Sequence, residues 1–349
     1  MLKTKSTKKN YKVGVLTGGG DCPGLNAAIR AIVKRGKQLG FNIVGIKNGW
    51  RGLVEGDSKI LNEDMVSGIL PWGGTILASS RTNPLKVKDG LKKISRNFKK
   101  LKLNALIVIG GDDTLGVVRS FPKNIPVVGI PKTIDNDLNG TDFCIGFQTA
   151  IRTTMEALDK LHSTAESHHR VMILEVMGRH FGWIATYAGL AGGADYILIP
   201  EIPIDINQVC KNIQARIKRG KEFSIIIIAE GAKLKEKEIV TKTDEKDIFG
   251  HARLGGIGDV VASLIKEKIG IDTRSSNLGH IIRGGTPCAF DRILGTRFGV
   301  KAIEMIAKKE FGRVVIFKEN KIKSTPFSKI SGGKKVDKEI YRIAKIFFG

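Results

Sequence analysis

Short runs of apolar residues, continuous rather than alternating with polar ones, constrain the fold of this chain more than any other feature of its sequence. The five clearest runs are residues 13–17, 105–109, 127–130, 171–176 and 224–229. A strand that is buried on both faces is apolar throughout, whereas a strand with one solvent face alternates. These runs therefore predict strands of parallel sheets in an α/β fold.

Helical patterns separate the predicted strands. Apolar residues recur on one face of residues 25–39 and of residues 147–161, which predicts an amphipathic helix in each segment. The charged stretch 233–246 predicts a solvated loop. A chain of 349 residues exceeds one typical hydrophobic core, so two domains, or one domain with a large insertion, are expected.

The charge balance is strongly basic, with 58 Lys and Arg against 34 Asp and Glu and a formal net charge of +24. Such a charge favours partners that carry phosphate, nucleic acid among them. The lysines, however, are spread along the chain, and the only dense cluster lies in residues 1–12. We therefore expect no nucleic-acid partner and keep a basic nucleic-acid-associated protein as a distant alternative. Small phosphorylated anions would gain from the same field.

Cysteine usage and hydropathy indicate the compartment. Cys22, Cys144, Cys210 and Cys288 show neither the paired spacing of a zinc site nor a dense disulfide framework, and so are expected to be reduced thiols. No apolar run approaches the roughly 18 residues of a membrane span. The sequence predicts a cytoplasmic protein without a membrane partner. Residues 1–10 are expected to form a disordered basic tail.

Polar motifs follow the predicted strands, and ligands of open parallel sheets bind at the carboxyl ends of strands. The first motif is the glycine-rich stretch 18–24, which precedes a predicted helix. Backbone N–H groups of such a loop can converge on an anion, and the helix N-terminus adds positive partial charge. A tight structural turn is the equally weighted alternative.

The next two motifs are GGDDT at residues 110–114 and PKTIDND at residues 131–137. Crowded carboxylates at strand ends are costly unless a cation or a hydrogen-bonding task compensates them. The carboxylates of Asp112, Asp135 and Asp137 could hold Mg²⁺ through water and accept a proton. Either segment alone could instead be a solvated acidic turn, but both in one sheet favour a site.

The remaining motifs lie at residues 177–180, 229–231 and 278–285. Each places arginine, histidine or glutamate beside glycine. A guanidinium is permanently charged and forms bidentate hydrogen bonds, which suits it to a phosphate. A single arginine or histidine is more often structural.

Taken together, five motifs resemble those of phosphofructokinases, over residues from about 11 to about 299. They are TGGGDCPGLNAAIR at 17–30, GGDDT at 110–114, PKTIDND at 131–137, MGRHFG at 177–182 and LGHIIRGGTPCAFDR at 278–292. The resemblance implies two Rossmann-like three-layer α/β domains with mainly parallel sheets and an active site in the cleft between them.

The expected domain boundaries follow from the same resemblance. A domain for the phosphoryl donor is expected over residues 11–146 and about 285–332. A domain for the sugar phosphate is expected over residues 147–284 and about 333–349.

The resemblance also implies a reaction, the transfer of a phosphoryl group to the 1-hydroxyl of fructose 6-phosphate, giving fructose 1,6-bisphosphate. The transfer is expected to be reversible and to serve glycolysis or gluconeogenesis. Asp135 then matches the catalytic base, and Thr133 and Arg179 match residues that contact the transferred group. Mg²⁺ is the implied cofactor, with Asp112 and Asp137 as its carboxylates.

Further residues match binding positions of the family. The donor positions are Gly19, Arg81, Asp113, Thr114 and Lys132. The sugar-phosphate positions are Thr133, Asp135, Arg170, Met177, Gly178, Arg179, Glu230, Arg274, His280 and Arg283. Arg170 and Arg274 match arginines that reach the neighbouring subunit's site, so a homodimer or homotetramer is implied.

The donor is expected to be pyrophosphate, with ATP as the alternative. ATP-using bacterial relatives carry glycine where Asp113 and Lys132 stand. Two unit charges about 4 Å apart interact by about 4 kcal/mol at an effective dielectric constant near 20, so a carboxylate at position 113 would repel the α-phosphate of ATP. Lys132 adds positive charge for the compact donor, but the distinction depends chiefly on Asp113.

Overall fold

The computed structural model describes residues 11–122, 124–235, 241–246 and 252–349. The chain divides into two compact units. The first comprises Met1–Thr149 and Arg283–Gly332, and the second comprises Ala150–Ile282 and Gly333–Gly349. The expected boundaries lay at 146/147 and 284/285, which put Arg283 in the second domain, whereas the structure groups Arg283 with the first unit. The tail over residues 1–10 lies outside the described residues.

The first unit contains a seven-stranded sheet of order β13-β12-β5-β4-β1-β2-β3. Its five inner strands are parallel, and the edge strands β3 and β13 are antiparallel to their neighbours. The strands are β1 (Tyr11–Thr17), β2 (Phe41–Ile46), β3 (Ser58–Leu61), β4 (Ala105–Gly110), β5 (Val127–Pro131), β12 (Arg313–Lys318) and β13 (Lys321–Pro326).

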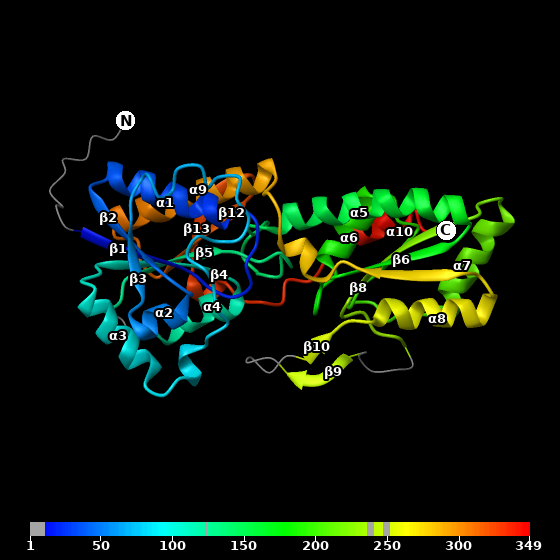
Figure 1. Ribbon diagram of the computed structural model, residues 1–349, viewed down its shortest axis with the longest axis horizontal. Coiled ribbons are helices and arrows are strands. Elements are labelled where there is room, and N and C mark those ends of the chain that lie inside the picture. Colours follow the sequence, from blue (N-terminus) through cyan, green and yellow to red (C-terminus); the bar gives the residue numbers. More distant parts are fainter. Residues whose placement is uncertain (1–10, 123, 236–240, 247–251) are drawn as a thin grey trace. The chain divides into compact units, whose positions relative to one another are not determined.

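Helices cover both faces of this sheet (Figure 1). Helices α1 (Leu25–Gln38) and α9 (Ala289–Ala307) pack together on one face, and α2 (Trp50–Glu55) and α3 (Gly90–Lys100) lie on the other. The apolar faces of α2 and α3 pack on β1, β2 and β4 and form one continuous core with them. Shorter helical segments are η1 (Pro84–Lys86), α4 (Asp112–Gly116), η2 (Val117–Ser120) and η4 (Phe327–Lys329).

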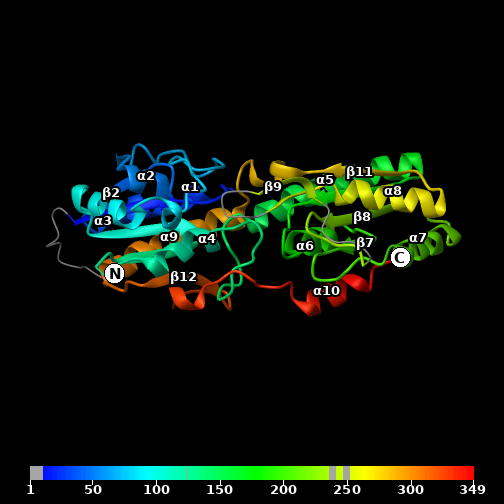
Figure 2. The same ribbon diagram turned by 90° about the horizontal axis from the view of Figure 1, so that it is seen from below.

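The second unit contains a four-stranded parallel sheet of order β11-β6-β8-β7. Helices α7 and α8 pack on one face, and α5, α6 and α10 lie on the other (Figures 1 and 2). The elements are α5 (Phe147–His168), β6 (Val171–Val176), α6 (Trp183–Ala191), β7 (Tyr196–Leu198), α7 (Ile206–Lys218), β8 (Ser224–Ala229), α8 (Ile257–Ile269), β11 (Thr273–Asn277), η3 (Gly279–Arg283) and α10 (Lys338–Lys345). A separate antiparallel pair consists of β9 (Thr241–Lys246) and β10 (Ala252–Leu254).

The sequence prediction of the fold is confirmed. All five apolar runs are strands of the two mainly parallel sheets, and both predicted helices form. Periodicity located the start of α5 but not its end, since the helix continues to His168. The loop prediction for residues 233–246 was wrong at its end, where β9 forms. Among the described residues, no helix has the length and apolarity needed to cross a membrane.

Candidate active site

The glycine-rich loop after β1 is held by neighbouring backbone. The N–H of Gly18 donates to the carbonyl of Ile109 over 2.9 Å, and the N–H of Gly19 donates to the carbonyl of Ser80 over 3.1 Å. Gly19 adopts φ +80°, a left-handed conformation that glycine tolerates without steric cost. Arg81 directly follows Ser80, so the predicted donor residues Gly19 and Arg81 come from two segments that this hydrogen bond joins.

Thr114 packs beneath this loop. Its side chain is buried, and a Cβ added at Gly18 would lie 2.7 Å from its methyl carbon. The indole N–H of Trp50 donates to the carbonyl of Thr114 over 3.2 Å. Thr114 therefore packs α4 against the end of β1, and α4 begins with Asp112 and Asp113. Trp50 is a supporting residue that the sequence analysis missed, because an apolar helix position gives no sign of its hydrogen bond.

Lys132 places a positive charge under the same loop. Its ammonium donates to the carbonyl of Gly20 over 2.5 Å, and its side chain is buried. Burial lowers the pKa of Lys132, and the charge of Arg283 acts in the same direction. The structure thus brings Gly19 and Lys132 together, as expected of two residues that serve one anionic ligand.

The carboxylates after β5 are fixed by Asn136. This residue is buried and adopts φ +50°, a left-handed conformation in which asparagine is enriched. Its side-chain amide donates to the carbonyl of Asp142 over 3.0 Å, and its side-chain oxygen accepts from the N–H of Cys144 over 3.1 Å. Held from both sides, Asn136 fixes the backbone between Asp135 and Asp137. The sequence analysis did not assign Asn136 a role.

Asp137 titrates abnormally. Burial raises the pKa of Asp137 to about 7, the negative charge of Asp135 adds to the rise, and that of Asp112 contributes further, while a hydrogen bond from Thr133 opposes it. An influence of this kind requires the three carboxylates to be neighbours. The charges of Asp135 and Asp112 and the hydroxyl of Thr133 thus all act on the carboxyl of Asp137.

These carboxylates suit a cation that keeps part of its shell as water and phosphate. One carboxylate oxygen of Asp112 is buried and has no hydrogen-bond partner. The guanidinium of Arg119 is 3.6 Å from the same oxygen. No group of three or more His, Cys, Asp or Glu side chains at ligand spacing occurs among the described residues. Mg²⁺ is commonly bound by one or two carboxylates together with substrate phosphate and water, so the residues present fit it.

Arg283 lies against the glycine-rich loop rather than apart from it. Its guanidinium donates to the carbonyl of Asp21 over 3.4 Å, and a Cβ added at Gly20 would lie 2.3 Å from the same nitrogen. The Nε atom of Arg283 is buried without a hydrogen-bond partner. The resemblance implied a contact of Arg283 with the sugar phosphate alone, whereas the structure shows it in contact with the glycine-rich loop.

The second unit has its own pair of adjoining loops, after β6 and β8. The N–H of Glu230 donates to the carbonyl of Val176 over 2.8 Å, and the N–H of Gly231 donates to that of Gly178 over 3.2 Å. A Cβ added at Gly231 would lie 1.9 Å from the carbonyl oxygen of Arg179, so only glycine fits there. Four predicted sugar-phosphate residues, Met177, Gly178, Arg179 and Glu230, are thus brought together. His280 is exposed in η3.

Arg170 and Arg274 both lie at the amino ends of their strands, at the other end from the loops just described. Both pair with Asp272, through contacts of 2.6 Å and 3.3 Å. They flank the amino ends of β6 and β11, whereas the loop of Met177 follows the carboxyl end of β6. At about 3.3 Å per residue, the seven residues from Arg170 to Met177 span about 23 Å. Arg274 lies beside Met172 in the register of the two strands, five residues or about 17 Å from Met177. The two arginines are therefore distant from the Met177 loop of their own unit.

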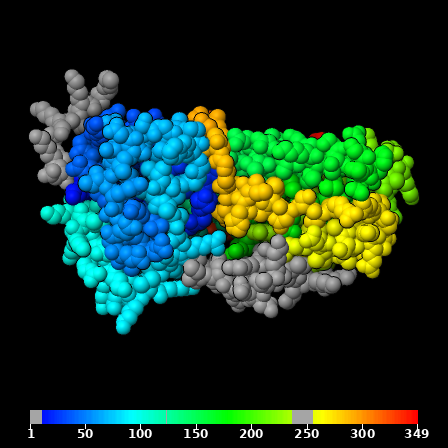
Figure 3. Space-filling model, viewed as in Figure 1, coloured from blue at the N-terminus to red at the C-terminus, as the bar shows by residue number. Residues whose placement is uncertain are grey.

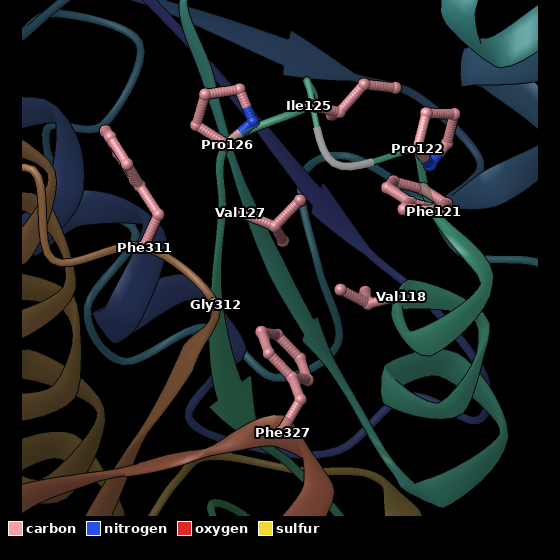
Figure 4. A pocket seen from close by; sticks show the side chains of 9 residues that line it. All are labelled: Val118, Phe121, Pro122, Ile125, Pro126, Val127, Phe311, Gly312 and Phe327. Atoms are coloured by element: carbon pink, nitrogen blue, oxygen red, sulfur yellow. The ribbon is translucent and has the colours of Figure 1, made fainter.

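An apolar pocket of about 370 Å³ lies elsewhere in the first unit, at the amino ends of β5 and β12 (Figure 4). The described residues that line it carry no charged side chain, and they are Val118, Phe121, Pro122, Ile125, Pro126, Val127, Phe311, Gly312 and Phe327. Recognition of a phosphorylated ligand requires positive charge or N–H donors. The candidate active site is therefore the set of loops at the carboxyl ends of the strands and not this pocket.

The close fit of Thr114 under Gly18 can be tested by mutation. We expect Gly18→Ala to lower the free energy of unfolding by about 1–3 kcal/mol, because the added methyl group overpacks the Thr114 side chain. Gly116→Ala is the control, since a Cβ there meets no atom within 4 Å. In the double variant Gly18→Ala/Thr114→Ala the two losses should be less than additive, as measured by denaturant unfolding. Additive losses would contradict the proposed contact.

Comparison with known proteins identifies the family to which the chain belongs. Residues 12–306 match the family model described as Phosphofructokinase. A pyrophosphate--fructose 6-phosphate 1-phosphotransferase of Streptomyces coelicolor is 49% identical over 97% of this chain and 100% of the relative. An ATP-dependent 6-phosphofructokinase of Corynebacterium efficiens is 46% identical over 97% of this chain and 99% of the relative.

Solved structures of phosphofructokinases are similar to this structure. The phosphofructokinase of Pichia pastoris in the T-state has a TM-score of 0.82 and 33% identity, and the match covers 93% of this chain and 36% of the Pichia chain. This chain thus spans about a third of that longer protein. The pyrophosphate-dependent phosphofructokinase of Marinobacter aquaeolei has a TM-score of 0.79, with 97% and 92% of the two chains covered. At 19% identity, the second likeness speaks to the fold alone. With its motifs gathered at the carboxyl ends of parallel strands, this chain belongs to the phosphofructokinase family.

Proposed function

We propose that the protein transfers a phosphoryl group from pyrophosphate to the 1-hydroxyl of fructose 6-phosphate, giving fructose 1,6-bisphosphate and phosphate. The observation that carries the reaction class is the cluster of Asp112, Asp135 and Asp137 beside the glycine-rich loop. The observation that carries the donor is the carboxylate of Asp113 at the start of α4. Relatives about half identical to this chain carry the corresponding name.

Phosphoryl transfer asks a protein to position groups and stabilise charge around an in-line displacement. Asp135 accepts the proton of the 1-hydroxyl as its oxygen bonds to phosphorus, and the bond from phosphorus to the bridging oxygen breaks to release phosphate. Thr133 and Arg179 hold the oxygens of the transferred group. Mg²⁺, when bound through Asp112 and Asp137, neutralises phosphate charge. The phosphoanhydride bond of pyrophosphate and the phosphoester bond formed in fructose 1,6-bisphosphate have similar free energies of hydrolysis. The reaction should therefore run in both directions.

The donor site favours a small anion. Lys132 offers a buried ammonium to phosphate beside the glycine-rich loop. Asp113 is exposed at the N-terminus of the short helix α4. Its carboxylate would repel an α-phosphate and the nucleoside attached to it, whereas pyrophosphate carries neither.

The sugar phosphate is held by Met177, Gly178, Glu230, His280 and other residues of that predicted set. We propose that Arg170 and Arg274 complete the site of a neighbouring subunit, since they are distant from the Met177 loop of their own unit. The active form is then at least a dimer. The free cysteines fit a reducing cytoplasm.

The general base is tested by Asp135→Ala. We expect turnover with pyrophosphate to fall by about 10² to 10⁴, the usual contribution of a positioned base. The dissociation constant of fructose 6-phosphate should change little, because the base acts on the hydroxyl during the reaction. A coupled assay of fructose 1,6-bisphosphate and calorimetric binding measure the two quantities. A wild-type turnover rate in this variant would place the base elsewhere.

The donor is tested by assays with pyrophosphate or ATP as sole donor. The unmodified enzyme should turn over with pyrophosphate, and Asp113→Gly should raise kcat/KM for ATP relative to pyrophosphate by about tenfold or more, equivalent to about 1.4 kcal/mol. Asp89→Gly is the matched control. It removes the same charge at an exposed position with φ +56°, where glycine fits, and should leave the donor ratio unchanged. Strong activity with ATP and none with pyrophosphate in the unmodified enzyme would refute the proposal.

The shared site is tested by complementation. Asp135→Ala and Arg170→Ala should each be nearly inactive alone. If Arg170 serves the neighbouring subunit, a mixed dimer contains one site with both residues intact, so co-expression of the two variants should restore up to about a quarter of wild-type activity. If Arg170 served its own subunit, no site in the mixture would be intact and no activity would return.

A further inference from the structure

Glu175 is a buried carboxylate to which none of the roles above applies. It lies in β6, one residue before the end of the strand, and its side chain is 1% exposed. Burying an ionised carboxylate is costly unless hydrogen bonds replace its water. Glu175 accepts from the N–H of Gly256 over 3.0 Å, from the N–H of Gly258 over 2.8 Å and from the side-chain amide of Asn277 over 2.6 Å. The carboxylate is therefore fully occupied by donors from two other segments.

The first of these segments is the N-terminus of α8. The cap residue Gly256 adopts φ +91° and offers no side-chain cap, so Glu175 supplies the acceptor from a different strand. The positive end of the helix dipole favours a negative charge at this place. The fit is close, because a Cβ added at Gly258 would lie 3.1 Å from a carboxylate oxygen of Glu175. The position and direction of α8 thus depend on this side chain.

The second segment is the end of β11. Glu175 and Asn277 are partners in the parallel register of β6 and β11. The main-chain carbonyl of Glu175 also accepts from the N–H of Leu278 over 3.0 Å. Figure 3 shows α8 and β11 side by side on the surface of the second unit. One residue of β6 therefore holds both neighbours, through its side chain and its main chain.

We propose that Glu175 is a positioning residue that fixes two segments of the second unit relative to each other, the loop after β6 that carries Met177 and the segment after β11 that carries His280. Met177 follows it by two residues on one side, and His280 follows Asn277 by three residues on the other. A shift of either segment would separate residues that must contact one sugar phosphate together. This inference rests on the proposed function and adds the means by which the acceptor site is held.

The test begins with Glu175→Gln. The amide keeps the size of the side chain but loses the charge, and it turns one acceptor into a donor that faces backbone N–H groups. We expect KM for fructose 6-phosphate to rise by about tenfold or more, as for the loss of one hydrogen bond to a charged group. KM for pyrophosphate should stay within about twofold, because the donor residues belong to the first unit.

Asp195→Asn is the matched control for stability. Asp195 belongs to the same unit, its side chain is 16% exposed, and it accepts from the N–H of Ile225 and pairs with Arg216, each over 2.8 Å. These contacts lie at the amino end of β8, away from the sugar-phosphate loops. The control should lower the melting temperature without raising KM for fructose 6-phosphate. An equal rise of KM in both variants would reduce Glu175 to a general stabilising residue and overturn the proposal.

A second variant tests the contact itself. Asn277→Asp places a second carboxylate next to Glu175 and should raise KM for fructose 6-phosphate in the same way. The double variant Glu175→Gln/Asn277→Asp restores one donor and one acceptor, and should recover part of the loss. No recovery would contradict the role of this pair. If the unmodified protein binds no fructose 6-phosphate by calorimetry, the proposed function fails. If it binds the sugar normally and Glu175→Gln binds it equally well, only this inference fails.

Discussion

The parallel pairing of β1, β4 and β5 is the constraint on which the candidate site depends. In this register Thr17 lies beside Ile109, and Gly110 lies beside Pro131. Parallel strands end at the same edge of a sheet, so three motifs that lie at residues 17–24, 110–114 and 131–137 become neighbours. The N–H of Gly18 donates to the carbonyl of Ile109, the N–H of Lys132 donates to the carbonyl of Gly110, and the ammonium of Lys132 donates to the carbonyl of Gly20. The direction of these strands therefore decides which loops of the candidate site are neighbours.

Two groups of opposite charge at this edge of the sheet, Lys132 and Asp137, are buried, and burial disfavours the charged form of each. Burial lowers the pKa of Lys132 and raises the pKa of Asp137, so each group is held away from its ordinary titration. In low-dielectric surroundings an unpaired charge is costly, and the cost falls when an ion of opposite sign binds. A phosphate donor and its metal ion supply both signs together. The chain's net charge of +24 attracts anions of every kind. The buried side chains of Lys132 and Asp137 can in addition favour one kind of anion over another.

The sequence predicted the strands and singled out the loops that follow them, because both signals are local. Five apolar runs identified the strands, and the residues after them made Asp112, Asp135 and Lys132 candidates. The supporting contacts have no such pattern in the sequence. The hydrogen bonds of Asn136 span only six and eight residues, but no periodic pattern marks the loop that they hold. Other contacts are distant along the chain, since Trp50 and Thr114 are 64 residues apart and Glu175 and Asn277 are 102 residues apart. The contact of Arg283 with Asp21 was missed for the same reason.

Overall similarity cannot decide the phosphoryl donor in this family, because relatives named for pyrophosphate and for ATP are 49% and 46% identical to this chain. Such a small difference in identity does not distinguish the two donors. In the function proposed above, the carboxylate of Asp113 at the start of α4 repels the α-phosphate that ATP carries and pyrophosphate lacks. On that proposal donor choice is a local electrostatic property of one side chain, which is how relatives of such similar identity to this chain can be named for different donors.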